Sequence, residues 1–260
     1  MTHLVTGTLE DGLATITLNR PEAGNAMSWE LIDGFSHVVE RLTGTPGVRA
    51  VLIRAEGKNF CVGGDIRSFA SESDPAGFIE RLARRLHEGL ALLAQHPAPI
   101  IVAAQGASAG AGLSLVASGD VVLVGRSASF AMAYTGIGLT ADGGATWLLP
   151  RLIGLRATQE MAYLGRRLDA AEAVDLGLAT RAIADETLAE EAAAIATRIA
   201  AGPTGAFGGV KRLLAQSYDT SLPNHLDAEA TAIGVAMAGT DAREGVAAFL
   251  ERRKPTYHGV

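Results

Sequence analysis

Short apolar runs that lead into glycine-rich turns, each followed by a helical pattern, constrain this chain most. The arrangement occurs at Val51–Asp65, at Ile100–Ser114 and, more loosely, at Val121–Gly144. Glycine adopts backbone conformations and close approaches that other residues resist. The chain has 31 glycines and 9 prolines, too many for a plain helix bundle. The pattern therefore predicts an α/β fold built from repeated strand-turn-helix units.

The flanking segments extend this architecture at both ends. Asp11-Gly12 is a hairpin signal, Ser28 can cap a helix, and the pattern becomes helical from about Glu186. We expect a core domain over residues 1–200 and a helical region over 201–260. The expected elements are a hairpin of Val5–Glu10 and Ala14–Leu18, strands at Ala50–Arg54, Ile100–Ala104 and Val121–Val124, amphipathic helices over Leu31–Leu42 and Phe78–Leu93, and C-terminal helices at Thr204–Ser217, Leu226–Met237 and Asp241–Arg253.

Composition excludes several classes of function. The net charge is −6 and no lysine-arginine tract occurs, so no nucleic-acid partner is expected. Residues 99–119 are uncharged but rich in Ala, Gly and Ser, which favours buried strand, turn and helix over a membrane span. Met1–Leu18 lacks a basic head and an apolar run, and Cys61 is the only cysteine, so we expect a cytoplasmic protein. The six histidines show no metal spacing, and no metal site is predicted.

The glycine turn at Gln105–Leu115 has three functional interpretations. Gly110-Ala111-Gly112 resembles a dinucleotide fingerprint, but Leu115 occupies the third glycine position. Gly106-Ala107-Ser108-Ala109-Gly110 matches a nucleophile elbow, with Asp142 and His225 as candidate partners of Ser108.

The third interpretation is an oxyanion hole. The turns at Cys61–Asp65 and Ala109–Gly112 could each direct one backbone N–H at the same oxygen. Each such donor contributes about 3 kcal/mol to transition-state stabilisation. The structural alternative is that both are tight turns that pack closely against their neighbours.

Several segments, taken in order, resemble the enoyl-CoA hydratase/isomerase (crotonase) family. They are Leu18-Asn19-Arg20-Pro21-Glu22 with Asn25-Ala26-Met27, Asn59–Ile66, Ile100–Asp120, Gly138–Gly154 and Glu244–Tyr257. The resemblance covers nearly the whole chain. It implies a crotonase-like spiral of ββα units with a C-terminal helical oligomerisation region, assembled as a homotrimer or hexamer. It also implies an acyl-CoA thioester substrate and no separate cofactor, because coenzyme A is part of the substrate.

The resemblance also assigns site residues. The oxyanion N–H groups fall on Gly64 and Ala111. Backbone near Ala26 and near Asp65-Ile66 matches segments that hold the CoA adenine, although Asp65 can equally be structural. Arg252 matches a basic residue that meets CoA phosphates across a subunit interface, or it is a solvated surface charge.

The chain departs from the family's hydratases at the two catalytic glutamates, whose positions match Ser114 and Tyr134. Hydration therefore lacks its usual acid and base. Asp142 remains, in a stretch similar to the isomerase branch that includes ring-1,2-epoxyphenylacetyl-CoA isomerases; its alternative role is to cap a helix over Gly143–Leu149. Ser114, Tyr134 and Trp147 are expected to line the acyl pocket. The prediction is an enoyl-CoA isomerase with Asp142 as acid and base; the alternatives are a hydratase or a non-catalytic acyl-CoA-binding protein.

Overall fold

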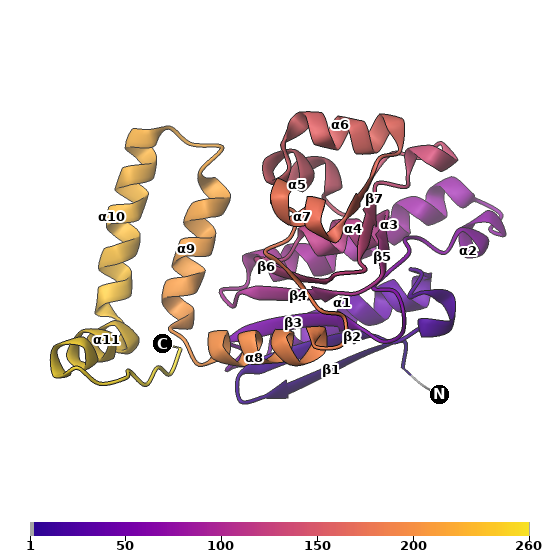
Figure 1. Ribbon diagram of the computed structural model, residues 1–260. Helices are drawn as coiled ribbons and strands as arrows, with labels where there is room; N and C mark the ends of the chain where they lie inside the picture. The colour runs from indigo at the N-terminus through magenta and orange to yellow at the C-terminus, as the bar shows by residue number, and fades with distance from the viewer. Residues whose placement is uncertain (1–2, 260) are drawn as a thin grey trace.

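A six-stranded sheet forms the centre of the molecule in the computed structural model, which describes residues 3–259. Its strand order is β1-β2-β3-β4-β6-β9, with β1 and β2 antiparallel and the other neighbours parallel (Figure 1). The hairpin turn uses positive φ at Asp11 and Gly12, which confirms the hairpin prediction. The strands are β1 Val5–Glu10, β2 Leu13–Leu18, β3 Ala50–Ala55, β4 Ile100–Ala104, β6 Val121–Gly125 and β9 Arg181–Ile183.

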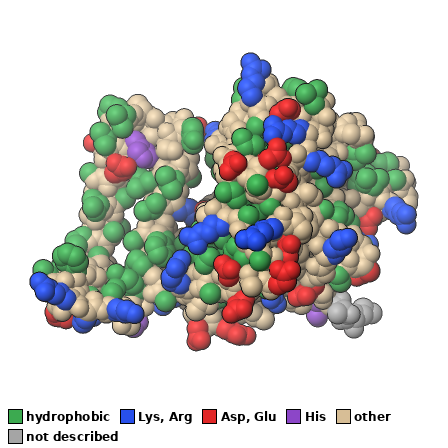
Figure 2. Space-filling model, viewed as in Figure 1, with side chains coloured by type: hydrophobic (Ala, Val, Ile, Leu, Met, Phe, Trp, Pro, Cys, Tyr) green, Lys and Arg blue, Asp and Glu red, His purple; other side chains and the backbone are tan. Residues whose placement is uncertain are grey.

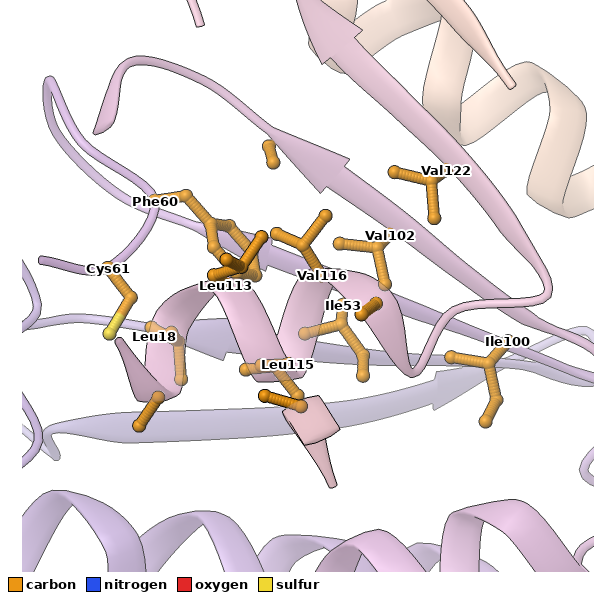
Figure 3. Close-up of a cluster of buried hydrophobic side chains, with 14 of the residues drawn as sticks. Leu18, Ile53, Phe60, Cys61, Ile100, Val102, Leu113, Leu115, Val116 and Val122 are labelled. Carbon is orange, nitrogen blue, oxygen red and sulfur yellow. The ribbon is translucent and has the colours of Figure 1, made fainter. Parts of the chain in front are cut away.

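Both faces of this sheet are covered, and alternate residues of each strand serve opposite faces. In β3, Ala50 and Leu52 belong to a cluster with α8 (Leu188–Ala200), which lies along one face in Figure 1. Val51 and Ile53 belong to the larger cluster on the other face. Figure 3 shows Ile53 and its neighbour Val102 beside Leu113 and Val116 of helix α4 (Ala111–Ala117). The helix that carries the second glycine turn is thus anchored in the core.

A second, three-stranded sheet adjoins the glycine turns. It has the order β5-β7-β8, with β5 Ala107–Ala109, β7 Ser129–Ala131 and β8 Arg167–Asp169. The chain enters it from β4 through Gly106, which has a φ of 57° and whose added Cβ would lie 2.1 Å from the Lys58 carbonyl oxygen. The predicted strand-turn-helix unit at Ile100–Ser114 is therefore a ββα unit, β4-β5-α4. Two short strands separated by one bend look like a strand and a turn in the sequence.

The helices surround the two sheets. Ser28 caps α1 by accepting the Leu31 N–H at 3.4 Å, which confirms the predicted cap. The C-terminal helices were also predicted, although α10 begins four residues earlier than expected because Leu222 and Pro223 start it. The other helices are α1 Trp29–Thr43, α2 Ile66–Ala70, α3 Pro75–Gln95, α5 Ala145–Leu152, α6 Gly154–Leu164, α7 Ala170–Leu176, α9 Thr204–Gln216, α10 Leu222–Ala238 and α11 Thr240–Glu251, with 3-10 turns η1 Pro21–Ala23 and η2 Thr135–Ile137.

The last three helices, α9 to α11, form an arm that projects from the body (Figure 1). Helix α10 has no buried residue, and hydrophobic side chains show along the arm in Figure 2. The Lys211 ammonium attaches α9 to the body through the Asp120 carboxylate at 3.0 Å. The Asp241 carboxylate accepts the N–H groups of His258 and Gly259, which folds the C-terminal tail back along α11. Within residues 3–259, no helix is both long and apolar enough to cross a bilayer.

Candidate active site around Asp142

The two glycine turns pack directly against each other. The Ala109 N–H donates to the Cys61 carbonyl at 3.0 Å, and the Cys61 N–H donates to the Ala107 carbonyl at 3.2 Å. An added Cβ would lie 3.0 Å from the Ala109 oxygen at Gly63 and 2.2 Å from the Cys61 oxygen at Gly112. The contact at Gly112 is not tolerable, and Gly63 has a φ of 104°, which side-chain-bearing residues rarely adopt, so both positions require glycine. Burial raises the pKa of the Cys61 thiol to about 12, so this cysteine is an inert packing group.

Each turn leaves one backbone donor unused. Ala111 is the first residue of α4, where an N–H has no partner within the helix, and Gly64 follows the positive φ of Gly63. Within residues 3–259, neither N–H donates a hydrogen bond to another group of the protein. The turns meet at Gly63 and Gly110, because an added Cβ on Gly110 would lie 3.7 Å from the Cα of Gly63. Two unused donors therefore belong to two adjoining turns.

Three polar side chains meet beside these turns. The Tyr134 hydroxyl donates to Oδ1 of Asp142 at 2.6 Å and lies 3.0 Å from Oγ of Ser114. The Ser114 hydroxyl also reaches the Asp142 carbonyl at 3.0 Å. Ser114 is fully buried, whereas Tyr134 and Asp142 are half-buried. An added Cβ on Gly110 would lie 3.8 Å from Cζ of Tyr134, which places the phenol ring next to the second glycine turn.

The environment keeps Tyr134 in its neutral form. Burial raises the pKa of its phenol well above the usual range, and the negative charge of Asp142 raises it further. The backbone of Tyr134 is fixed as well, because its carbonyl accepts the N–H groups of Ile137 and Leu139, each at 3.1 Å. Tyr134 is therefore a fixed hydrogen-bond donor to the aspartate.

His87, on α3, contacts the peptide that follows Asp142. Its Nε2 accepts the Gly143 N–H at 3.0 Å, so the ring proton is on Nδ1. Gly143 has a φ of 60°, and an added Cβ would lie 2.7 Å from the Cβ of Ser114. Sequence reasoning does not single out His87, because a single histidine on an amphipathic helix is ordinarily a surface residue.

The segments predicted to hold the CoA adenine lie side by side. The Met27 N–H donates to the Gly63 carbonyl at 2.8 Å, and the Asp65 N–H donates to the Met27 carbonyl at 3.0 Å. Arg20 bridges them, since its Nη1 donates to Oδ2 of Asp65 at 2.7 Å and to the Ala26 carbonyl at 3.0 Å. The hydrogen bond from Arg20 lowers the pKa of Asp65. Asp65 thus takes part in a contact that joins the two segments, and Arg20 is a site-supporting residue that sequence reasoning had not assigned.

Ser114, Tyr134 and Asp142 together are called the Asp142 group here. Three other predicted side chains lie outside it. Ile66 begins α2 with half of its side chain exposed, beside the Asp65 segment. Trp147, on α5, stacks under the Arg151 guanidinium at 3.8 Å and lines a cavity of about 400 Å³ that also includes His87 and Gly143. Arg252 ends α11 in the left-handed conformation, on the projecting arm. Within a single chain, Arg252 and the Asp142 group belong to different parts of the molecule.

The two competing interpretations of Gln105–Leu115 do not fit the structure. Ser108 is fully buried in β5, and no group among residues 3–259 hydrogen-bonds its Oγ. Its supposed partner His225 lies on α10 and approaches Glu229 instead. A dinucleotide fingerprint needs open backbone at its second glycine, but Gly112 packs against the Cys61 carbonyl.

The interpretation of Asp142 as a helix cap is wrong. Helix α5 begins at Ala145 with Gly144 as its N-cap, and no side chain caps it. The carboxylate of Asp142 instead accepts the Tyr134 hydroxyl, while only its backbone carbonyl accepts the Ala145 N–H. Because Gly143 and Gly144 have positive φ, helix α5 begins only at Ala145. Asp142 therefore lies before the helix, where its carboxylate contacts Tyr134.

Comparison with known proteins finds relatives that are similar over nearly the whole chain. Residues 8–260 match the model of the enoyl-CoA hydratase/isomerase family. The chain is 35% identical to the 1,2-epoxyphenylacetyl-CoA isomerase of Escherichia coli over the full length of both. It is 28% identical to the trans-2-decenoyl-[acyl-carrier-protein] isomerase of Streptococcus mutans, covering 96% of each.

Solved structures give the same result. The crystal structure of an enoyl-CoA hydratase from Mycobacterium smegmatis superposes with a TM-score of 0.91 at 32% identity, covering 98% of this chain and 99% of that one. Its similarity extends over both sheets and the helical arm, because almost every residue is included. The chain therefore has the α/β crotonase fold and belongs to the enoyl-CoA hydratase/isomerase family of acyl-CoA enzymes.

Proposed function

We propose that this protein is an enoyl-CoA isomerase that shifts a double bond with Asp142 as its acid and base. The observation that carries the proposal is the composition of the polar group beside the glycine turns. Within residues 3–259, Asp142 is the one carboxylate that hydrogen-bonds Ser114 or Tyr134. The group thus offers a single proton-moving side chain next to two unused backbone donors.

The reaction follows from these parts. Asp142 removes a proton from carbon 2 of a 3-enoyl-CoA, and the electron pair spreads from carbon 2 over the thioester and the existing double bond. The resulting dienolate oxygen is stabilised by the N–H groups of Gly64 and Ala111, each worth about 3 kcal/mol. The protonated aspartate then delivers the proton to carbon 4, which leaves the double bond between carbons 2 and 3.

Hydration needs a different set of groups. A water must be held and split by one group while another protonates carbon 2, which usually takes two carboxylates. Ser114 and Tyr134 occupy the positions of those carboxylates by resemblance, and they hydrogen-bond each other and Asp142. Hydroxyls that are already partnered in this way are poor bases at neutral pH, which favours isomerisation.

A comparison of two assays tests the proposal. Purified protein is given 3-enoyl-CoAs of six to ten carbons and, separately, crotonyl-CoA, and the conjugated product and the hydrated product are quantified. We expect isomerisation to exceed hydration by at least about 100-fold, the usual worth of one general acid or base. Rapid hydration of crotonyl-CoA would assign the protein as a hydratase. Binding of saturated acyl-CoA without turnover of any enoyl-CoA would assign it as a non-catalytic binder.

The helical arm supports a proposal about assembly. Exposed hydrophobic side chains include Ile233 and Val235 on α10 and Phe249 on α11, and α10 has no buried residue. Such a face is unfavourable in water and is typical of an interface between subunits. We propose a homotrimer or hexamer, with residues 201–260 as the oligomerisation region and Arg252 placed to meet CoA phosphates across the interface.

A further inference from the structure

The carboxylate of Asp142 is held asymmetrically. Its Oδ1 accepts the Tyr134 hydroxyl at 2.6 Å, whereas no group among residues 3–259 donates a hydrogen bond to Oδ2. A separation of 2.6 Å is typical of a hydrogen bond between a hydroxyl and a charged carboxylate, which is the stronger class. One carboxylate oxygen is therefore occupied and the other is free.

The donor itself is fixed in place from several sides. The Tyr134 ring packs against the hydrophobic core, and its carbonyl accepts two backbone N–H groups. Oγ of Ser114, on α4, lies 3.0 Å from the phenol oxygen. The single phenol proton is directed at the carboxylate, so this serine can donate to the phenol oxygen or to the Asp142 carbonyl. In either case the Tyr134 hydroxyl keeps one orientation, with its proton directed at Asp142.

The main chain of Asp142 is restrained independently. Its carbonyl lies 3.0 Å from Oγ of Ser114 and accepts the Ala145 N–H at 3.1 Å. The next peptide donates its N–H, from Gly143, to His87. With the backbone fixed at both ends and one oxygen held by Tyr134, rotation of the carboxylate about its last bond would break a charge-assisted hydrogen bond.

We infer that Tyr134 is a positioning residue, which holds Oδ1 of Asp142 and thereby makes Oδ2 the oxygen that moves the proton. The inference rests on the proposed isomerisation. Oδ2 takes the proton from carbon 2 and returns it to carbon 4, while Oδ1 continues to accept the Tyr134 hydroxyl in both protonation states. Because the same oxygen removes and returns the proton, hydrogen is transferred within one active site instead of exchanging with water.

Kinetics of the Tyr134→Phe variant tests this role. The ring and its packing remain, so the affinity for saturated acyl-CoA and the KM for a 3-enoyl-CoA should be unchanged. Loss of a hydrogen bond to a charged group should lower kcat about tenfold to hundredfold. In the same variant, transfer of deuterium from carbon 2 to carbon 4 should decline in favour of exchange with water. A kcat within about twofold of the wild type would overturn the inference.

Titration of Tyr134 tests the contact without depending on activity. Burial raises the pKa of its phenol, and the charge of Asp142 raises it further. Asp142→Asn removes the charge and keeps the burial, so ultraviolet absorbance should show Tyr134 ionising at a lower pH in this variant than in the wild type. Subtraction of the same titration of Tyr134→Phe separates the Tyr134 signal from that of the other tyrosines. An unchanged titration of Tyr134 in Asp142→Asn would overturn the inference.

Asp142→Asn separates this inference from the proposed function. If Asp142→Asn abolishes isomerisation but Tyr134→Phe does not slow it, Tyr134 has no positioning role and the isomerase assignment stands. If Asp142→Asn retains full activity, the proposed reaction is wrong. In that case the titration still decides whether Tyr134 holds the carboxylate.

Discussion

At the scale of single residues, the site depends on contacts between positions distant in sequence. The sequence predicts Asp142, Ser114 and Tyr134 as site residues, but it does not predict their contacts: Tyr134 reaches Asp142 from the start of η2, and Ser114 reaches it from α4. Sequence spacing does not encode such contacts, because each depends on the path of an intervening turn. The same limitation concealed His87 and Arg20, whose partners lie 56 and 45 positions away.

His87 provides the first residue-scale prediction. His87→Leu removes the acceptor of the Gly143 N–H and should lower kcat about threefold to tenfold, the equivalent of one neutral hydrogen bond. His87→Gln restores an acceptor and should return kcat to within about twofold of the wild type. Steady-state kinetics on a 3-enoyl-CoA measures both variants.

A second histidine, directly after the same helix, is the matched control. His96 is the C-cap of α3, and its Nδ1 accepts the Ala98 N–H at 3.1 Å. His96→Leu should lower the melting temperature without changing kcat. Equal loss of kcat in His96→Leu and His87→Leu would show that the effect is general destabilisation.

At the scale of elements, the glycine turns serve two purposes that the sequence presented as alternatives. The turns do pack tightly, as Gly63 and Gly112 show, and they also leave the N–H groups of Gly64 and Ala111 without protein partners. The sequence could predict the strands and helices here because their apolar patterns are local. It could not predict the second sheet, because β5, β7 and β8 have only three residues each and depend on pairing across the fold.

Gly112→Ala tests the close packing of the turns. The added methyl group would lie 2.2 Å from the Cys61 oxygen, so the turns must move apart, and we expect a loss of about 1–3 kcal/mol or more. Gly34→Ala, in α1, is the control, because its methyl group would lie 3.7 Å from Val5. Alanine favours helix, so this variant should be neutral or up to about 1 kcal/mol more stable. Unfolding in urea measures both; equal stabilities would contradict the packing argument.

At the scale of the whole molecule, a compact body carries the site and a projecting arm carries many of the exposed hydrophobic side chains (Figures 1 and 2). The helices of the arm could be predicted because apolar residues recur along them at helical spacing without interruption. Their purpose was not evident from their periodicity alone, since an apolar face can pack inside a chain or between chains. The structure of one chain leaves α10 without a buried residue, which motivates the proposed assembly.

Light scattering tests the assembly. The chain mass is 26.8 kDa, and we expect three or six times that value in dilute buffer. Ile233→Lys and Phe249→Lys place charges on the exposed face of the arm and should shift the protein toward monomer, because a buried unpaired charge is costly at an interface. A wild-type monomer across micromolar concentrations would contradict the proposal.

The central claim is that Asp142 moves the proton, and the Asp142→Asn variant tests it most directly. Asparagine keeps the shape of the side chain and can still accept the Tyr134 hydroxyl, so binding of saturated acyl-CoA, measured by calorimetry, should barely change. Removal of the base should lower kcat for 3-enoyl-CoA isomerisation about 10²–10⁴-fold. Turnover of the variant at the wild-type rate, with acyl-CoA still bound, would contradict the account.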